Sequence, residues 1–91
     1  MVDIVLIAFI YYYFSAMKTY EFPIIIEKDE DGFYVADCPA FQGCHTQGKT
    51  LEEALVNIRE VIELHIEDRK ASGEEIPKVK TVSLTSLEVT V

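Results

Sequence analysis

Apolar and polar residues alternate along the segment from Thr19 to Glu27. The apolar side chains fall at every second position: Tyr20, Phe22, Ile24 and Ile26. A period of two is typical of a β-strand with one buried face. Pro23 lies on the alternate face and has no backbone N–H to donate, which favours an edge position or a bulge.

A second apolar segment, Phe33–Asp37, follows an acidic turn. The turn, Lys28–Gly32, has the sequence KDEDG, and Asp and Gly are common turn residues. The two segments are therefore predicted to form an antiparallel hairpin. The next segment, Cys38–Gly43, combines Pro, Gly and small residues that interrupt regular structure, and Cys44–Gln47 is predicted as a short third strand.

After Gly48 the pattern changes to a helical period. Thr50 is a favourable N-cap, and Glu53 three positions later completes a capping box, so the helix is predicted to begin at Leu51. Ser72 and Gly73 are predicted to end it. Its apolar positions form one stripe that can cover a sheet: Leu51, Ala54, Leu55, Ile58, Val61, Ile62, His65 and Ile66. The outer face is polar and predicted to contact solvent: Glu52, Glu53, Asn57, Arg59, Glu60, Glu63 and Glu67.

The C-terminal sequence VKTVSLTSLEVTV alternates again. Its alternation changes phase at Thr85 and Ser86, which predicts a terminal strand with a bulge or two short strands. The expected fold is α+β, a two-layer sandwich with a mostly antiparallel sheet in the order strand, strand, strand, helix, strand. One face of that sheet is still to be covered.

The first sixteen residues differ from the rest of the chain. They contain an unbroken apolar run, Ile4–Phe14, which is shorter than the roughly 20 residues of a membrane helix and has no Lys or Arg before it, unlike a signal peptide. Three interpretations remain: a membrane anchor, an extra strand on a sheet edge, or a leader that exists only because the start was assigned upstream of Met17. We favour the last, with residues 1–16 as a leader and residues 17–91 as the domain.

Length and charge exclude several classes of protein. Ninety-one residues with 49% hydrophobic side chains fit one domain, whose small core would gain from association with another chain. The net charge of −8 is the opposite of what nucleic-acid binding selects. An acidic surface steers towards a basic partner, although it also serves solubility alone.

The cysteines and histidines give little evidence of chemistry. Cys38 and Cys44 are too few for a disulfide scaffold and have no zinc-ligand spacing even with His45 beside them, so we expect reduced thiols in a cytoplasmic protein, with no metal and no cofactor. His65 lies on the apolar side of the helix near its C-terminal end, where a structural role is expected.

These motifs together resemble a known family. The shared features are an acidic turn ending in Gly, an aromatic strand with Tyr34, a segment with Pro39 and Gly43, and the run T-x-G-x-T-x-x-E-A formed by Thr46, Gly48, Thr50, Glu53 and Ala54. In these features, from Lys18 to about Pro77, the chain resembles the N-terminal domain of HicB-like antitoxins of type II toxin–antitoxin systems.

The resemblance implies a fold like a truncated ribonuclease-H sheet with one helix. It also implies a partner, a small basic HicA-like toxin that cleaves mRNA and that the antitoxin covers without performing chemistry itself. Longer members have a DNA-binding segment after this domain, whereas only about fourteen residues, read as strand, follow Pro77 here. A DNA-binding role is therefore not expected.

Each motif residue has a structural or a binding interpretation. The structural set is expected to shape turns and cap the helix: Gly32, Pro39, Gly43, Gly48, Thr50 and Glu53. The expected partner-binding set is a charged hairpin tip with an adjacent aromatic: Asp29, Glu30, Asp31 and Tyr34.

Two alternatives stay open. A ribonuclease-H-like nuclease would need carboxylates that hold two metal ions, but no helix carboxylate lies on the buried side to converge with Asp37, so we expect no catalytic residues and no enzyme. A homo-oligomeric HicB-like binding module with no toxin partner also fits, and a homodimer or higher homo-oligomer is compatible with both readings.

Overall fold

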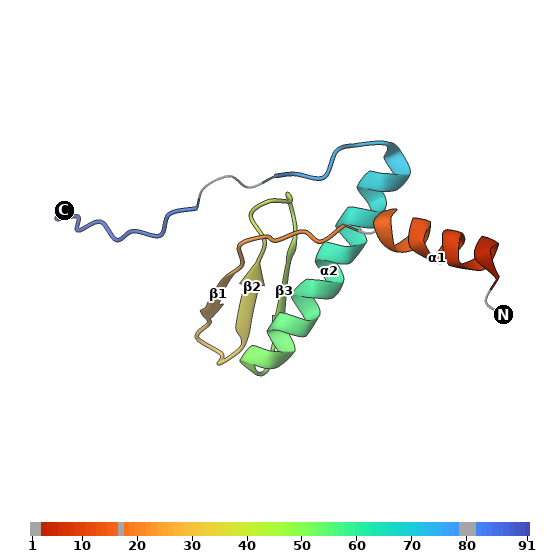
Figure 1. Cartoon of the computed structure of the whole chain (residues 1–91). Helices are drawn as coiled ribbons and strands as arrows, with labels where there is room; N and C mark the ends of the chain where they lie inside the picture. The colour runs from red at the N-terminus through yellow and green to blue at the C-terminus, as the bar shows by residue number, and fades with distance from the viewer. Residues whose placement is uncertain (1–2, 17, 79–81) are drawn as a thin grey trace.

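The alternating segments of the chain form a three-stranded antiparallel sheet with a long helix packed on one face (Figure 1). The computed structural model describes residues 3–16, 18–78 and 82–91. Its elements are α1 (Ile4–Ala16), β1 (Ile25–Lys28), β2 (Tyr34–Asp37), β3 (His45–Gly48) and α2 (Leu51–Ser72). The predicted α+β class, the hairpin, the third strand and the helix are confirmed.

The strand order is β1-β2-β3, so β2 is central and both other strands are edges. In the register, Ile26 lies opposite Ala36, and Ala36 lies opposite Thr46. These three residues share one face of the sheet because side chains alternate along each strand. Ala36 is fully buried on this face, which is the one that α2 covers.

The first strand is shorter than the alternation predicts. Thr19–Glu27 was expected, whereas β1 begins only at Ile25, opposite Asp37. The next residue of the neighbouring strand, Cys38, already enters a turn, in which its N–H donates to the carbonyl of Cys44 at 2.9 Å. Residues 19–24 therefore lack a strand partner, although their half-buried side chains Phe22 and Ile24 still pack on the core.

Helix α2 begins and ends where the sequence predicts. The hydroxyl Oγ1 of Thr50 accepts a hydrogen bond from the Glu53 N–H at 3.1 Å. Gly73 caps the other end in the left-handed conformation (φ +72°), with its N–H directed at the carbonyls of Arg69 and Lys70. Both ends of the helix are thus satisfied by local bonds.

The apolar stripe of α2 is only partly buried. Ala54 and Ile58 are buried, and four of the remaining stripe positions are half-buried: Val61, Ile62, His65 and Ile66. The prediction was wrong for Leu51 and Leu55, which are 42% and 44% exposed, because three strands are too narrow to cover the whole stripe.

The core is small and centres on Phe41, which the turn between β2 and β3 places under α2. Its ring contacts those of Phe22 and His65, with centroids 5.1 and 5.3 Å away, and the Arg69 guanidinium lies 5.3 Å from the ring centroid. His65 therefore has the structural position that the sequence predicts. The fully enclosed side chains are Ala36, Cys38, Phe41, Cys44, Ala54 and Ile58.

The apolar N-terminal segment forms the helix α1 and not a strand. Asp3 begins it, since its carbonyl accepts from the Ile7 N–H and its side chain from the Val5 N–H. A continuous apolar run without a strand partner satisfies its backbone groups only within a helix, so the strand interpretation was wrong. Within the described residues α1 contacts no strand and not α2, and no helix there is long and apolar enough to cross a membrane.

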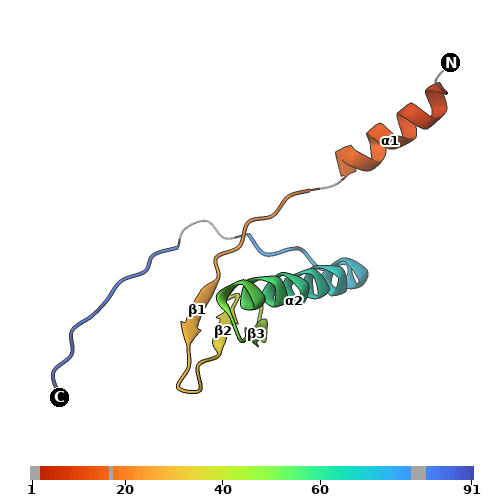
Figure 2. The same cartoon turned by 90° about the horizontal axis from the view of Figure 1, so that it is seen from below.

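The predicted terminal strand is absent from the described residues 82–91. This segment is extended but pairs with nothing, and it leaves the domain on the side opposite to α1 (Figure 2). The prediction of a strand was therefore wrong for this part, while residues 79–81 lie outside the described residues. An alternating sequence becomes a strand only where a sheet edge receives it.

Candidate functional site

The acidic hairpin tip, residues 29–32, is organised by one of its own carboxylates. Oδ1 of Asp29 accepts hydrogen bonds from the N–H groups of Asp31 and Phe33 at 3.0 and 2.8 Å. The Asp29 N–H donates to the Phe33 carbonyl at 2.8 Å, and the Gly32 N–H donates to the Asp29 carbonyl at 3.1 Å. The turn is thus closed by four bonds that all involve Asp29.

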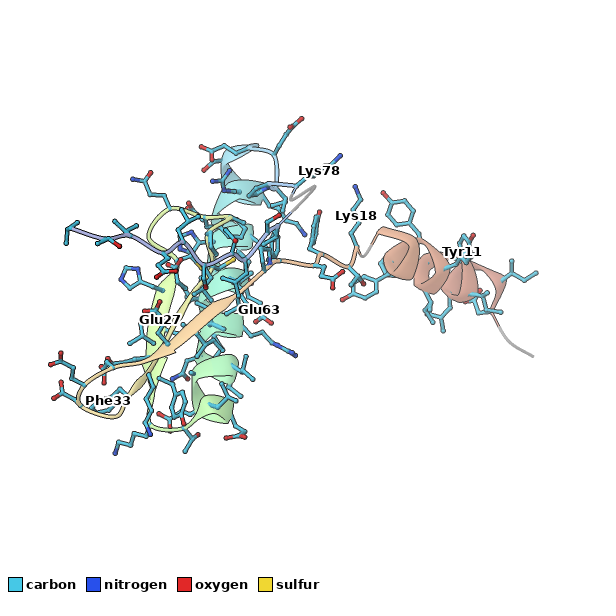
Figure 3. The ribbon with its side chains drawn as sticks, turned by 90° about the vertical axis from the view of Figure 1, so that its left-hand side faces the viewer. Tyr11, Lys18, Glu27, Phe33, Glu63 and Lys78 are labelled. Atoms are coloured by element: carbon cyan, nitrogen blue, oxygen red, sulfur yellow. The ribbon has the colours of Figure 1, made fainter. Side chains whose placement is uncertain are left out.

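Gly32 permits this turn because its φ is +88°, in the region that L side chains rarely adopt. The predicted partner-binding residues therefore differ in whether their side chains are free to bind a partner. Asp29 is engaged in the turn, whereas Glu30 and Asp31 are exposed on its outside. Figure 3 shows the neighbouring Phe33 at the outer end of the hairpin, far from Tyr11 on α1.

Tyr34, the fourth predicted contact residue, lies at the base of the tip. It is half-buried and packs on the core cluster, and Lys28 covers its ring with Nζ 5.6 Å from the ring centroid. The structure therefore brings all four predicted residues to one end of the sheet, but Tyr34 offers a partner only part of its surface.

The register adds residues that the sequence analysis did not place there. Tyr34 pairs with Gly48, so the start of α2 lies at the same end of the sheet as the hairpin tip (Figure 1). Glu52 and Glu53 in the first turn of α2 are exposed there. We call the exposed carboxylates of Glu30, Asp31, Glu52 and Glu53 the acidic end. Only the pairing of β2 with β3 could have revealed it.

Gly48 makes this arrangement possible. A Cβ at this position would lie 2.5 Å from the backbone N of Ala54, so the strand can approach the helix so closely only without a side chain. The sequence analysis predicted Gly48 for its backbone conformation. The structure instead requires glycine at this position because it has no Cβ. Asn57 adds a hydrogen bond between α2 and β3, since its Nδ2 donates to the Gln47 carbonyl at 2.9 Å.

The remaining motif residues have structural positions. Gly43 has a φ of +73° and lies with Pro39 in the turn between β2 and β3. Thr50 and Glu53 form the N-cap bond of α2. These residues therefore shape the turn before β3 and the start of α2.

The two thiols lie together in the core. Both are fully buried, and a hydrogen bond joins the two thiols. Burial and the neighbouring Cys38 raise the pKa of Cys44 from 9.0 to about 11, and burial also raises the pKa of Cys38. Both thiols are therefore protonated at neutral pH and are poor nucleophiles or ligands.

The carboxylate that a nuclease would need is isolated. Asp37 lies opposite Ile25 and His45, in a row on the face of the sheet that α2 does not cover. Among the residues described, no group of three or more acidic, histidine or cysteine side chains could hold a metal ion. The arrangement of Asp37 gives no support to two-metal catalysis.

Comparisons of sequence give a consistent family. The family model described as a HicB-like antitoxin of bacterial toxin–antitoxin systems matches residues 22–89. The UPF0150 protein Ta0767 of Thermoplasma acidophilum is 49% identical over 65 residues, which cover 71% of this chain and 94% of that protein. The UPF0150 protein ssr1765 of Synechocystis is 49% identical over 61 residues, covering 67% of this chain and 77% of the relative.

Solved structures point to the same family as the sequence comparisons. The crystal structure of the N-terminal domain of the Burkholderia pseudomallei antitoxin HicB matches with a TM-score of 0.60 and 33% identity, over 67% of this chain and 72% of that one. The crystal structure of the Burkholderia pseudomallei antitoxin HicB matches with a TM-score of 0.61 and 33% identity, over 70% of this chain and 48% of that one. The residues that the family model matches, 22–89, include the hairpin tip and the acidic end.

Proposed function

The chain belongs to the family of HicB-like antitoxins of bacterial toxin–antitoxin systems, and on this basis we propose that it binds a small basic HicA-like toxin and covers its RNA-cleaving surface. The observation that carries the proposal is the match to the N-terminal domain of an antitoxin HicB, at 33% identity over two thirds of this chain. The proposal places this activity in the cytoplasm, where mRNA is cleaved.

Charge supports a basic partner. The chain has a net charge of −8, and the acidic end has exposed carboxylates from the hairpin and the first turn of α2 at the same end of the sheet. Charge complementarity of this kind accelerates association and suppresses wrong partners more than it raises affinity. We therefore expect association with the toxin to slow strongly as salt is added.

The mechanism is occlusion and includes no catalytic step by this chain. The partner-binding residues are Glu30 and Asp31 at the tip, supported by the turn that Asp29 closes, with Tyr34 at the base as an aromatic contact. An aromatic beside charged residues can anchor an interface whose rim stays hydrated. DNA binding is not part of the proposal.

The first experiment identifies the partner. The tagged chain, expressed in its source cell, should recover a small basic protein in a near one-to-one ratio at moderate salt. The purified chain should then abolish the ability of that protein to cleave mRNA. Recovery of a one-to-one partner without ribonuclease activity, or of this chain alone, would contradict the proposal and favour a homo-oligomeric module.

The second experiment locates the interface by calorimetry with the purified toxin. Changing Glu30 and Asp31 together to Lys should weaken binding roughly 10- to 100-fold and flatten its salt dependence, because two attractive charges become repulsive. Asp29 is left unchanged so that the turn survives. The matched control changes Glu67 and Asp68 to Lys, the same charge change in the last turns of α2. Equal loss in both variants would mean a general charge effect and would contradict binding at the tip.

A further inference from the structure

The C-terminal segment exposes apolar side chains in the pattern of a strand. Leu84 and Leu87 are 98% and 85% exposed, and Val89 is 75% exposed. Within Leu87–Val91 the apolar residues occupy alternate positions, with Glu88 and Thr90 between them. Such a segment lacks two things that a strand needs, backbone partners and an apolar surface to cover.

The outer edge of β1 offers the backbone partners. Asp29 donates to the Phe33 carbonyl across the hairpin. Because hydrogen-bonded positions alternate along an antiparallel pair, Glu27 also bonds towards β2, and the backbone groups of Ile26 and Lys28 point outward. No described strand pairs with them.

The other edge of the sheet is not equivalent. Cys38 donates to the Cys44 carbonyl, so by the same alternation the backbone groups of Gln47 point outward on β3. The Gln47 carbonyl is already bound by Asn57 Nδ2 at 2.9 Å. Helix α2 thus protects the β3 edge, whereas the β1 edge remains available for a further strand.

A largely apolar groove next to the N-terminal end of β1 supplies the surface, and its lining also includes the charged residues Lys18, Glu21, Arg59 and Glu63. It has a volume of about 650 Å³ and runs between the segment before β1 and helix α2. The apolar side chains that line it are Tyr20, Phe22, Ile24, Leu55, Ile58, Ile62 and Ile66. They include Leu55, one of the two stripe residues that the three-stranded sheet leaves exposed. A fourth strand at this edge would cover the groove with one of its faces.

The course of the tail indicates which chain supplies that strand. Val82 lines a pocket together with Glu21, Phe22 and Pro23, just before β1. Beyond Val82 the tail runs away from the sheet (Figures 1 and 2), and Leu84, Leu87 and Val89 are 98%, 85% and 75% exposed. The best-alternating part of the tail therefore lies away from its own sheet edge and is available to another molecule.

We propose that Leu87–Val91 of one copy adds as a fourth strand to the β1 edge of a second copy, with Leu87, Val89 and Val91 facing the groove. The exchange is reciprocal, so two tails complete two sheets in a closed dimer. It gives this small core additional apolar burial that the single chain lacks. The proposal is independent of toxin binding.

Hydrogen exchange of the full chain tests the pairing directly. We expect slow exchange at the amides of Ile26 and Lys28 and at alternate amides of Leu87–Val91, with protection that increases with protein concentration. Mixing isotope-labelled and unlabelled chains should give NMR contacts between the Leu87 and Val89 methyl groups of one chain and the Ile62 methyl groups of the other. Association through α1 alone would leave the tail amides unprotected and would overturn the proposal.

Paired variants make the test specific. Leu87→Asp with Val89→Asp should raise the dimer dissociation constant at least tenfold in sedimentation experiments and remove protection at Lys28. Ser86→Asp with Thr90→Asp adds the same charges on the face of the strand opposite to Leu87 and Val89. This variant should change the dimer dissociation constant by less than about threefold. Contacts only within one chain, tail protection without Lys28 protection, or equal effects of the two variants would each overturn the proposal.

Discussion

At the scale of single residues, Asp29 has a structural role that its charge does not indicate. It belongs to the acidic tip by sequence, yet its carboxylate accepts two backbone hydrogen bonds that close the hairpin. Glu30, its neighbour in the chain, makes no such bond among those described. Composition alone could not distinguish these two carboxylates, because the difference depends on which one faces back into the turn.

Replacing Asp29 by Ala should therefore destabilise the domain. Two backbone donors lose their acceptor, and we expect the free energy of unfolding in urea to fall by about 1–3 kcal/mol. Asp29→Asn removes the charge but keeps an acceptor oxygen, and Glu30→Ala removes only an exposed charge, so both should stay within about 0.5 kcal/mol. A loss in Asp29→Asn as large as in Asp29→Ala would show that charge, and not the turn, is responsible.

The buried thiols predict how stability depends on pH. The folded state raises the pKa of Cys44 to about 11, above its ordinary 9.0, so folding favours the protonated thiol. Its contribution is complete below pH 9 and is lost as the pH rises from 9 towards 11, because there the unfolded thiol ionises and the folded one does not. The free energy of unfolding in urea, measured at several pH values between 9 and 11, should fall more steeply with pH in the native chain than in Cys44→Ala. Parallel pH profiles would contradict the prediction, as would rapid thiol labelling of the folded protein near pH 8.

At the scale of elements, the sequence correctly predicted the features that depend on residues close together in the chain. The hairpin, the Thr50 cap and the Gly73 end of α2 depend on neighbouring residues, and all were found as predicted. The length of β1 and the fate of the C-terminal segment depend on which edges meet, and these predictions were wrong. The acidic end was missed for the same reason, since it exists only through the pairing of Tyr34 with Gly48.

The junction of β3 with α2 should tolerate almost no added volume. Gly48→Ala places a Cβ where the structure has 2.5 Å to the Ala54 nitrogen and 2.9 Å to the Glu53 carbonyl carbon, both backbone atoms. We expect the free energy of unfolding to fall by about 1–3 kcal/mol, as for an overpacked core. Lys49→Ala next to it is exposed and should change stability by less than about 0.5 kcal/mol. An unchanged urea midpoint for Gly48→Ala would contradict the close approach.

At the scale of the whole molecule, the chain is much more extended than its length requires. Its radius of gyration is 18.7 Å, whereas a compact domain of this length has about 12 Å. The excess comes from α1 and the C-terminal segment, which project from opposite sides of the sheet and helix (Figure 2). The sheet and α2 form the fold, and the two projections carry most of the exposed large apolar side chains among the described residues.

Removing residues 1–16 should leave the stability of the body intact. Helix α1 contacts neither the strands nor α2 in the described part of the chain, so the free energy of unfolding should change by less than about 0.5 kcal/mol. Binding of a hydrophobic dye should fall, because the exposed side chains of α1 are apolar all round. A loss of more than about 1 kcal/mol would mean that α1 docks on the body in solution. Intact mass from the native source would show whether the chain begins at Met1 or at Met17.

The order of the elements also affects how the chain reaches its structure. Within the described residues, packed elements are adjacent in the sequence or one strand apart: β1 with β2, β2 with β3, and α2 with β3 and β2. Low sequence separation between contacts favours rapid folding. During synthesis the hairpin can form as soon as β2 has left the ribosome, and the body is complete once α2 follows. The tail follows α2 in the chain, so the body can already be folded when the tail emerges and meets another molecule.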